Sequence, residues 1–159
     1  MKFYILIIFS LLTVIYHSQS FAANDRDAHV LIFASFSMPK ESLKALSNQA
    51  NQVGAPVIIR GLVNNSFKET VKKLTEFNLL QTGIQIDPLL FKRFGIQKVP
   101  AVVVTNNIAC PPNQTCLAQF DVLYGNIPLS YALKVIANKN DPVSHFAVEA
   151  LQKMQVNHA

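Results

Sequence analysis

Apolar runs and amphipathic segments alternate along most of the chain. The run over residues 29–36 is short and nearly continuous, which is typical of a strand buried on both faces. Apolar residues then recur at helical spacing as far as Val53, and Gly54 follows where a helix C-cap is expected. Ser37 is a candidate N-cap for this helix, and Pro39 falls in its first turn, where no amide hydrogen bond is lost.

The middle of the chain repeats this order. Residues 56–62 predict a second buried strand, and Ser66 is expected to cap a helix over residues 67–77. Residues 84–86 form a short apolar stretch, after which Asp87 is expected to cap a short helical turn.

The second half predicts a hairpin and a helix. Residues 99–104 indicate a third strand, and residues 117–123 alternate between apolar and polar positions as an antiparallel partner does. A helix over residues 128–137 follows. The predicted order of elements is therefore strand, helix, strand, helix, and then two strands and a helix. This order predicts an α/β domain over residues 29–138, with a mixed sheet flanked by helices.

One more amphipathic helix is predicted in residues 139–159. It begins near Asp141-Pro142, and apolar residues recur at helical spacing as far as Met154. Two arrangements are open for this C-terminal extension. Its apolar face packs back on the domain, or it binds a partner.

The N-terminus has the order of a secretory signal. Lys2 precedes an apolar run of 14 residues, a polar stretch follows, and the small residues Ala22 and Ala23 come next. The run is shorter than the ~20 residues that a membrane-spanning helix needs. We therefore expect residues 1–22 to be cleaved after export, leaving residues 23–28 as a flexible leader. A retained membrane anchor is the alternative.

Charge and composition narrow the function class. Without Lys2 the chain has 13 basic and 9 acidic residues, a net charge of +4. The basic residues are scattered, whereas a nucleic-acid groove needs a dense stripe with exposed aromatic residues. The sequence shows no phosphate-binding glycine loop, no nucleophile elbow and no distinct carboxylate pair. It therefore predicts no catalytic residue, no cofactor and no nucleic-acid partner.

Two cysteines, Cys110 and Cys116, lie in the exported part. Nearby thiols usually pair in an oxidising compartment, so we expect a structural disulfide that contributes roughly 2 to 2.5 kcal/mol and constrains one loop rather than the whole fold. The alternative is a catalytic pair, although neither thiol is predicted at a helix N-terminus and two prolines stiffen the loop. Zinc binding is not favoured, because the histidines show no ligand spacing.

The junction between the first strand and the first helix resembles that of the thioredoxin fold. Phe36 falls at the thioredoxin aromatic position and Pro39 at its proline, whereas Ser37 and Lys40 replace the two redox cysteines. The resemblance implies a thioredoxin-like sheet without a redox centre, because thiol exchange needs a thiolate at the helix N-terminus.

Around this junction we predict a binding surface. Its candidate residues are Phe36, Ser37, Met38, Pro39, Lys40, Val99 and Pro100. In thioredoxin-like proteins the proline at the start of the hairpin is cis, which leaves the backbone of the preceding residue free to pair with an extended peptide. The simpler interpretation is that residues 37–40 only start a helix.

A second candidate patch consists of Arg60, Asn64 and Asn65. It follows the C-terminal end of a buried strand, which often marks a site in open α/β sheets. The simpler interpretation is that Arg60 forms an ion pair with Glu69, Asp87 or another acid.

Several longer motifs occur together in the order typical of one family. They are Ser35-Phe-Ser-Met-Pro39, Arg60-Gly-Leu-Val-Asn-Asn-Ser-Phe67, Ile86-Asp-Pro-Leu-Leu-Phe91, Phe94-Gly-Ile96 and Val99-Pro-Ala-Val-Val103. Over residues 29–137 the chain resembles the TrbC family of type-F conjugative transfer systems.

The resemblance implies a periplasmic pilin-assembly protein of a type IV secretion system. It also implies that the protein acts together with an envelope protein of the TraW kind and with other pilus-assembly components. We therefore expect a non-catalytic interaction protein with no stable membrane anchor after signal cleavage. The alternative is a periplasmic thiol-disulfide oxidoreductase or isomerase that uses Cys110 and Cys116.

Overall fold

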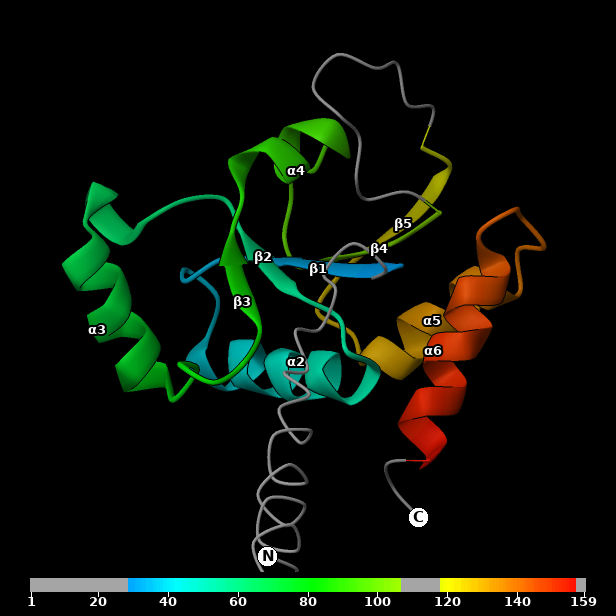
Figure 1. Cartoon of the computed structure of the whole chain (residues 1–159), viewed down its shortest axis with the longest axis horizontal. Helices are drawn as coiled ribbons and strands as arrows, with labels where there is room; N and C mark the ends of the chain where they lie inside the picture. The colour runs from blue at the N-terminus through cyan, green and yellow to red at the C-terminus, as the bar shows by residue number, and fades with distance from the viewer. Residues whose placement is uncertain (1–28, 107–117, 157–159) are drawn as a thin grey trace, which may run out of the picture.

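The computed structural model describes residues 29–106 and 118–156 (Figure 1). The expected signal peptide with its cleavage site at Ala22 and Ala23, the leader, and the expected Cys110–Cys116 disulfide lie outside the described residues. Within the described residues no helix has the length and apolar content needed to cross a membrane.

A mixed sheet forms the centre of the fold. Its strands within the described residues are β1 (Val30–Ala34), β2 (Val57–Ile59), β3 (Ile84–Ile86), β4 (Ala101–Thr105) and β5 (Phe120–Tyr124). They lie in the order β3-β2-β1-β4-β5. The pairs β1–β2 and β2–β3 are parallel, whereas β1–β4 and β4–β5 are antiparallel. The mixed α/β fold with a terminal hairpin is thus confirmed.

Two strand predictions differ from the structure. The apolar stretch that ends at Ile86 is a true strand, β3, which pairs with β2 at one edge of the sheet. The strand predicted to continue to Leu62 stops at Ile59, because the chain turns into a short 3-10 helix, η2 (Val63–Asn65).

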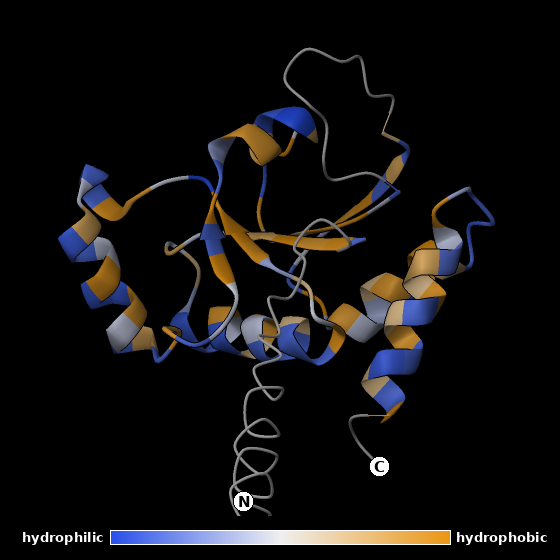
Figure 2. Ribbon diagram, in the orientation of Figure 1, coloured by the Kyte–Doolittle hydropathy of each residue, from blue (hydrophilic) through white to orange (hydrophobic). Residues whose placement is uncertain are grey.

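Helices cover both faces of the sheet. They are α2 (Lys40–Val53), α3 (Phe67–Phe77), α4 (Pro88–Arg93), α5 (Leu129–Ala137) and α6 (Ser144–Val156). Figure 1 shows α2, α5 and α6 on one side of the sheet and α4 on the other. The strands are hydrophobic along most of their length, whereas the helices carry both hydrophobic and hydrophilic positions (Figure 2).

The alternation of side chains along β1 divides the buried residues into two clusters. Ile32 and Ala34 belong to a main core beneath α2, α5 and α6, whereas Leu31 and Phe33 belong to a second core beneath α4. In the second core the ring of Phe33 meets that of Phe91 edge to face, with centroids 4.9 Å apart. Because successive side chains of a strand point to opposite faces, both faces of β1 are buried.

Three helix ends are capped by the residues that the sequence predicts. Gly54 adopts the left-handed conformation with φ of 69° and caps α2. The Ser66 hydroxyl accepts from the Glu69 amide of α3 at 3.3 Å. Asp87 Oδ1 accepts from the amides of Leu89 and Leu90 at 2.8 and 3.0 Å.

The predicted cap at Ser37 is wrong. Helix α2 begins at Lys40 after Pro39, and no side chain caps it. Proline disfavours helical conformation in the residue before it, so Met38 cannot start the helix and Ser37 lies too far from its free amides. The Ser37 hydroxyl lies 2.9 Å from that of Ser35 instead.

Helix α6 packs back on the domain, which decides between the two arrangements open for the C-terminal helix. Ala147, Ala150 and Met154 are buried in the main core, where α6 contacts α5 and α2. The imidazole of His29 stacks on the ring of Phe146, with centroids 3.6 Å apart. The apolar stripe of α6 is therefore largely used within the protein.

Ala147→Asp tests this packing. Ala147 is fully buried, so the substitution places an unpaired carboxylate in the core and should lower the free energy of unfolding by roughly 3 kcal/mol. Val148→Asp is the matched control, because Val148 is 42% exposed on the same helix and its change should stay within about 1 kcal/mol. Urea denaturation measures both. Equal effects of the two substitutions would contradict the docking of α6.

Candidate binding surface

Strand register brings the two sequence-predicted patches to one end of the sheet. Ala34 is opposite Ile59, and Phe33 is opposite Ala101. The residues that follow β1, the residues that follow β2, and Pro100 before β4 therefore leave the sheet at the same end. Figure 1 shows the loops after β1 and β2 on the side of the sheet that faces α3.

The strand–helix junction presents mainly polar atoms to solvent. Ser37, Pro39 and Lys40 are exposed, whereas Phe36 and Met38 are partly buried against the main core. The Phe36 ring approaches that of Phe77 in α3 at a steep angle, with centroids 6.5 Å apart. Phe36 and Met38 thus contribute to folding as well as to the surface.

The peptide bond between Val99 and Pro100 is cis, as the resemblance to thioredoxins predicts. Val99 is partly buried against the second core. The Pro100 carbonyl accepts from the Gly125 amide at 3.0 Å, which holds the end of the β4–β5 hairpin in place. The predicted pair therefore comes immediately before β4, the strand that pairs with β1.

Arg60 does not form the expected ion pair with Glu69 or Asp87. Its Nη2 donates to the Ile96 carbonyl at 2.6 Å, and its Cζ lies 4.8 Å from the centroid of the Phe91 ring. Within the described residues no carboxylate lies within ion-pair distance of this guanidinium. Both carboxylates accept hydrogen bonds from nearby groups instead. Asp87 accepts from amides at the start of α4, and Glu69 accepts from the Asn64 side chain.

Asn64 and Asn65 form a tight turn after β2. Their φ angles are 50° and 55°, in the left-handed region that asparagine tolerates better than most residues. Asn64 Nδ2 donates to Glu69 Oε2 at 2.7 Å, and the Val63 amide donates to the Thr70 hydroxyl at 2.9 Å. These bonds fix the turn against the start of α3.

A hollow joins the junction to the Arg60 patch. It measures about 450 Å³ and lies between the loop after β1, the loop after β2, and α3. The residues that line it include Ser35, Phe36, Ser37, Arg60, Leu62, Asn64 and Lys73. A neighbouring hollow of about 310 Å³ also contains Arg60, together with Phe91 and Lys92. Phe36 and Ser37 of the first patch thus share a hollow with Arg60 and Asn64 of the second, whereas the other predicted residues line neither hollow.

Sequence reasoning missed three residues of this surface. Leu62 was assigned to a buried strand but is 36% exposed, because β2 ends before it. Lys73 and Lys92 are separated from Arg60 in sequence, and only the placement of α3 and α4 brings them to the same hollows. Their positive charges gave no signal in the sequence, where the basic residues are scattered.

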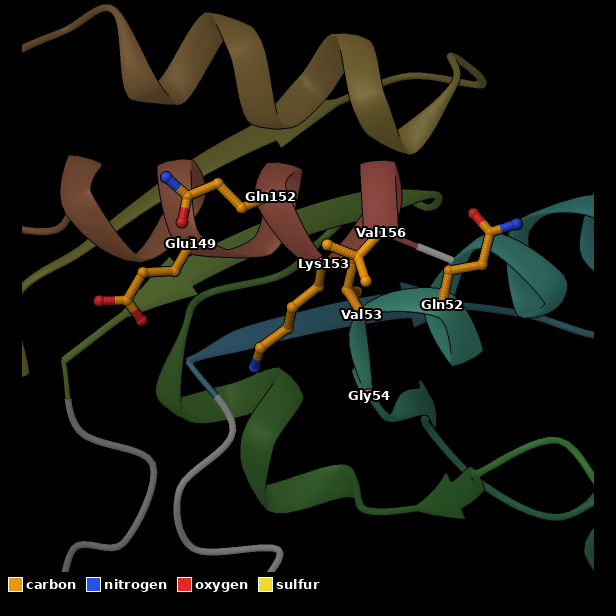
Figure 3. A pocket seen from close by; sticks show the side chains of 7 residues that line it. All are labelled: Gln52, Val53, Gly54, Glu149, Gln152, Lys153 and Val156. Atoms are coloured by element: carbon orange, nitrogen blue, oxygen red, sulfur yellow. The ribbon is translucent and has the colours of Figure 1, made fainter. Parts of the chain in front are cut away.

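A third hollow of about 570 Å³ lies at the other end of α2, where it meets the last turns of α6. Figure 3 shows Val53, Lys153 and Val156 close together there. The sequence-predicted residues do not line this hollow. In the described part of the chain, no three His, Cys, Asp or Glu side chains are grouped as a metal site requires.

The chain is similar to one protein family and to a curated relative. The family model described as type-F conjugative transfer system pilin assembly protein, TrbC, matches residues 32–136. The periplasmic protein TrbC of Escherichia coli (strain K12) is 35% identical over 113 residues, which are 70% of this chain and 49% of the relative. The chain thus spans about half the length of this curated relative. No solved structure matches.

Proposed function

The chain belongs to the TrbC family of type-F conjugative pilin assembly proteins, and we propose that it is a non-catalytic assembly protein that works through protein–protein contacts in the periplasm. The single observation that carries the proposal is the family match, because it covers residues 32–136 and hence nearly the whole sheet and the helices before α6. The name of the Escherichia coli relative supports the compartment. A cleaved signal at residues 1–22 is the proposed route of export.

The proposed fold relationship is thioredoxin-like. Three features support it: the parallel β1-α2-β2 unit, the β4–β5 hairpin followed by α5, and the cis Pro100 at the start of β4. Ser37 and Lys40 stand where thioredoxins carry their cysteines. A serine hydroxyl does not provide the thiolate that disulfide exchange needs, so the fold is proposed to serve binding alone.

The proposed contact surface lies at the end of the sheet described above. It consists of Phe36, Ser37, Met38, Pro39, Lys40, Arg60, Asn64, Asn65, Val99 and Pro100. The exposed polar groups and the open hollow suit a partner that is held reversibly during assembly. An envelope protein of the TraW kind is the proposed partner, with other pilus-assembly components as further candidates.

Charge reversal at Lys40 tests the contact surface. Lys40 is exposed at the start of α2, so Lys40→Glu should leave the thermal stability unchanged but lower plasmid transfer by about tenfold or more, because reversed charge at an interface is repelled. Lys153→Glu is the control, because Lys153 lies on α6 and lines the hollow beside Val53 and Gly54, at the end of α2 opposite to Lys40. The 14 residues of α2 span roughly 21 Å. The measurement is transfer frequency in cells that lack the native gene. Full transfer by both folded variants would count against this surface.

The rival function is thiol–disulfide exchange through Cys110 and Cys116. We expect the purified chain not to reduce insulin, and the double variant Cys110→Ala/Cys116→Ala to support pilus assembly once folded. The loss of a short disulfide loop should lower stability by roughly 2 kcal/mol, which a denaturation curve measures separately. Insulin turnover that disappears in Cys110→Ala would instead identify an oxidoreductase.

A further inference from the structure

We propose that the Arg60 groove binds an extended acidic segment of a partner protein. The Arg60 groove is the pair of hollows that meet at Arg60, lined on one side by Phe36, Leu62 and Lys73 and on the other by Phe91 and Lys92. The inference rests on the proposed function only in assuming that the chain acts through protein contacts. It adds the chemistry of the segment that is bound.

Charge is the first argument. Arg60 and Lys73 line the larger hollow, and Arg60 and Lys92 line the smaller one. Among the described residues no carboxylate lines either hollow. The groove therefore carries a positive potential that favours an anionic occupant.

Neither of the two acids in the sequence-predicted pairing, Asp87 and Glu69, forms an ion pair with Arg60. Asp87 is held by two amides at the start of α4, and Glu69 by the side chain of Asn64. Of the three cations that line the groove, Lys73 is paired, with its Nζ 3.6 Å from Glu76 Oε2, whereas Arg60 and Lys92 form no ion pair within the described residues.

The fixed position of Arg60 is the second argument. A guanidinium has five N–H donors, and one of those of Arg60 donates to the Ile96 carbonyl at 2.6 Å. The guanidinium also lies over the Phe91 ring, with Cζ 4.8 Å from the ring centroid. The exposed side chain is thus oriented before a ligand arrives, which lowers the entropic cost of a bidentate contact to a carboxylate.

The shape of the groove is the third argument, and it favours a peptide over a single small anion. Hollows of about 450 and 310 Å³ extend to either side of Arg60, with aromatic or aliphatic side chains in both walls. An added Cβ at Gly61 would meet no atom within 4 Å, so the space beside this Cα, next to Arg60, is open. Such a groove fits apolar side chains placed next to carboxylates along an extended segment.

Peptide binding by the purified, signal-free chain tests the proposal. The probes are overlapping short peptides that cover the envelope proteins of the same transfer system, each acidic one paired with a version in which Gln and Asn replace Glu and Asp. Fluorescence anisotropy gives the dissociation constants at low and high salt. The variants are Arg60→Gln, the double variant Lys73→Gln/Lys92→Gln, and Lys153→Gln as the control from the hollow in Figure 3.

We expect the bound peptides to be acidic and to lose roughly tenfold or more in affinity when their carboxylates become amides. Arg60→Gln should weaken binding by a similar factor, and added salt should weaken it further. The double variant leaves the Arg60–Ile96 bond intact, so it should weaken binding even if Arg60→Gln disturbs the fold. Lys153→Gln should bind as the wild type does.

Four outcomes would overturn the proposal: no peptide bound, bound peptides that are neutral or basic, affinities insensitive to Arg60 and to Lys73/Lys92, or displacement by inorganic phosphate at the peptide's own concentration. The last would identify a small-anion site. None of these four outcomes contradicts the proposed function if Lys40→Glu still lowers plasmid transfer. Conversely, normal transfer by Lys40→Glu would count against the proposed contact surface without changing the peptide affinities.

Discussion

The burial of β1 on both faces is the constraint on which the rest of the structure depends. A strand of five apolar residues must pair on both edges and be covered on both sides, so β2 and β4 flank it and helices cover each face. Its register with β2 and β4 then sets where three chain segments leave the sheet. The Arg60 groove lies at that end because Ala34, Ile59 and Ala101 are aligned there.

Local signals in the sequence predicted most helices and strands. They failed where a contact distant in sequence decides the structure, and where two local preferences oppose each other. Asp87 and Gly54 act on their own neighbours, so their roles follow from sequence. Ser37 looked like a cap, but Pro39 prevents the helix from starting early enough to use it. Residues 84–86 are too few to be distinguished from a loop until β2 is beside them.

The candidate site was predictable only in part. The residues around Phe36 and Pro100 follow from the resemblance to known folds, and the structure places them at one end of the sheet. The environment of Arg60 could not be predicted, because it depends on the carbonyl of Ile96 and the ring of Phe91, both distant in sequence. Membership in the TrbC family supplies the biological setting, whereas these contacts supply the chemistry of binding that we infer.

We propose that this end of the sheet faces a partner in the assembled machinery. Site-specific photocrosslinking in the intact envelope tests it most directly, with the crosslinking group placed at Leu62 in the groove or at Gln152 on α6. We expect a crosslink from Leu62 to an envelope protein of the transfer system, and none from Gln152. A crosslink from Gln152 alone, with the chain folded and transfer intact, would contradict it.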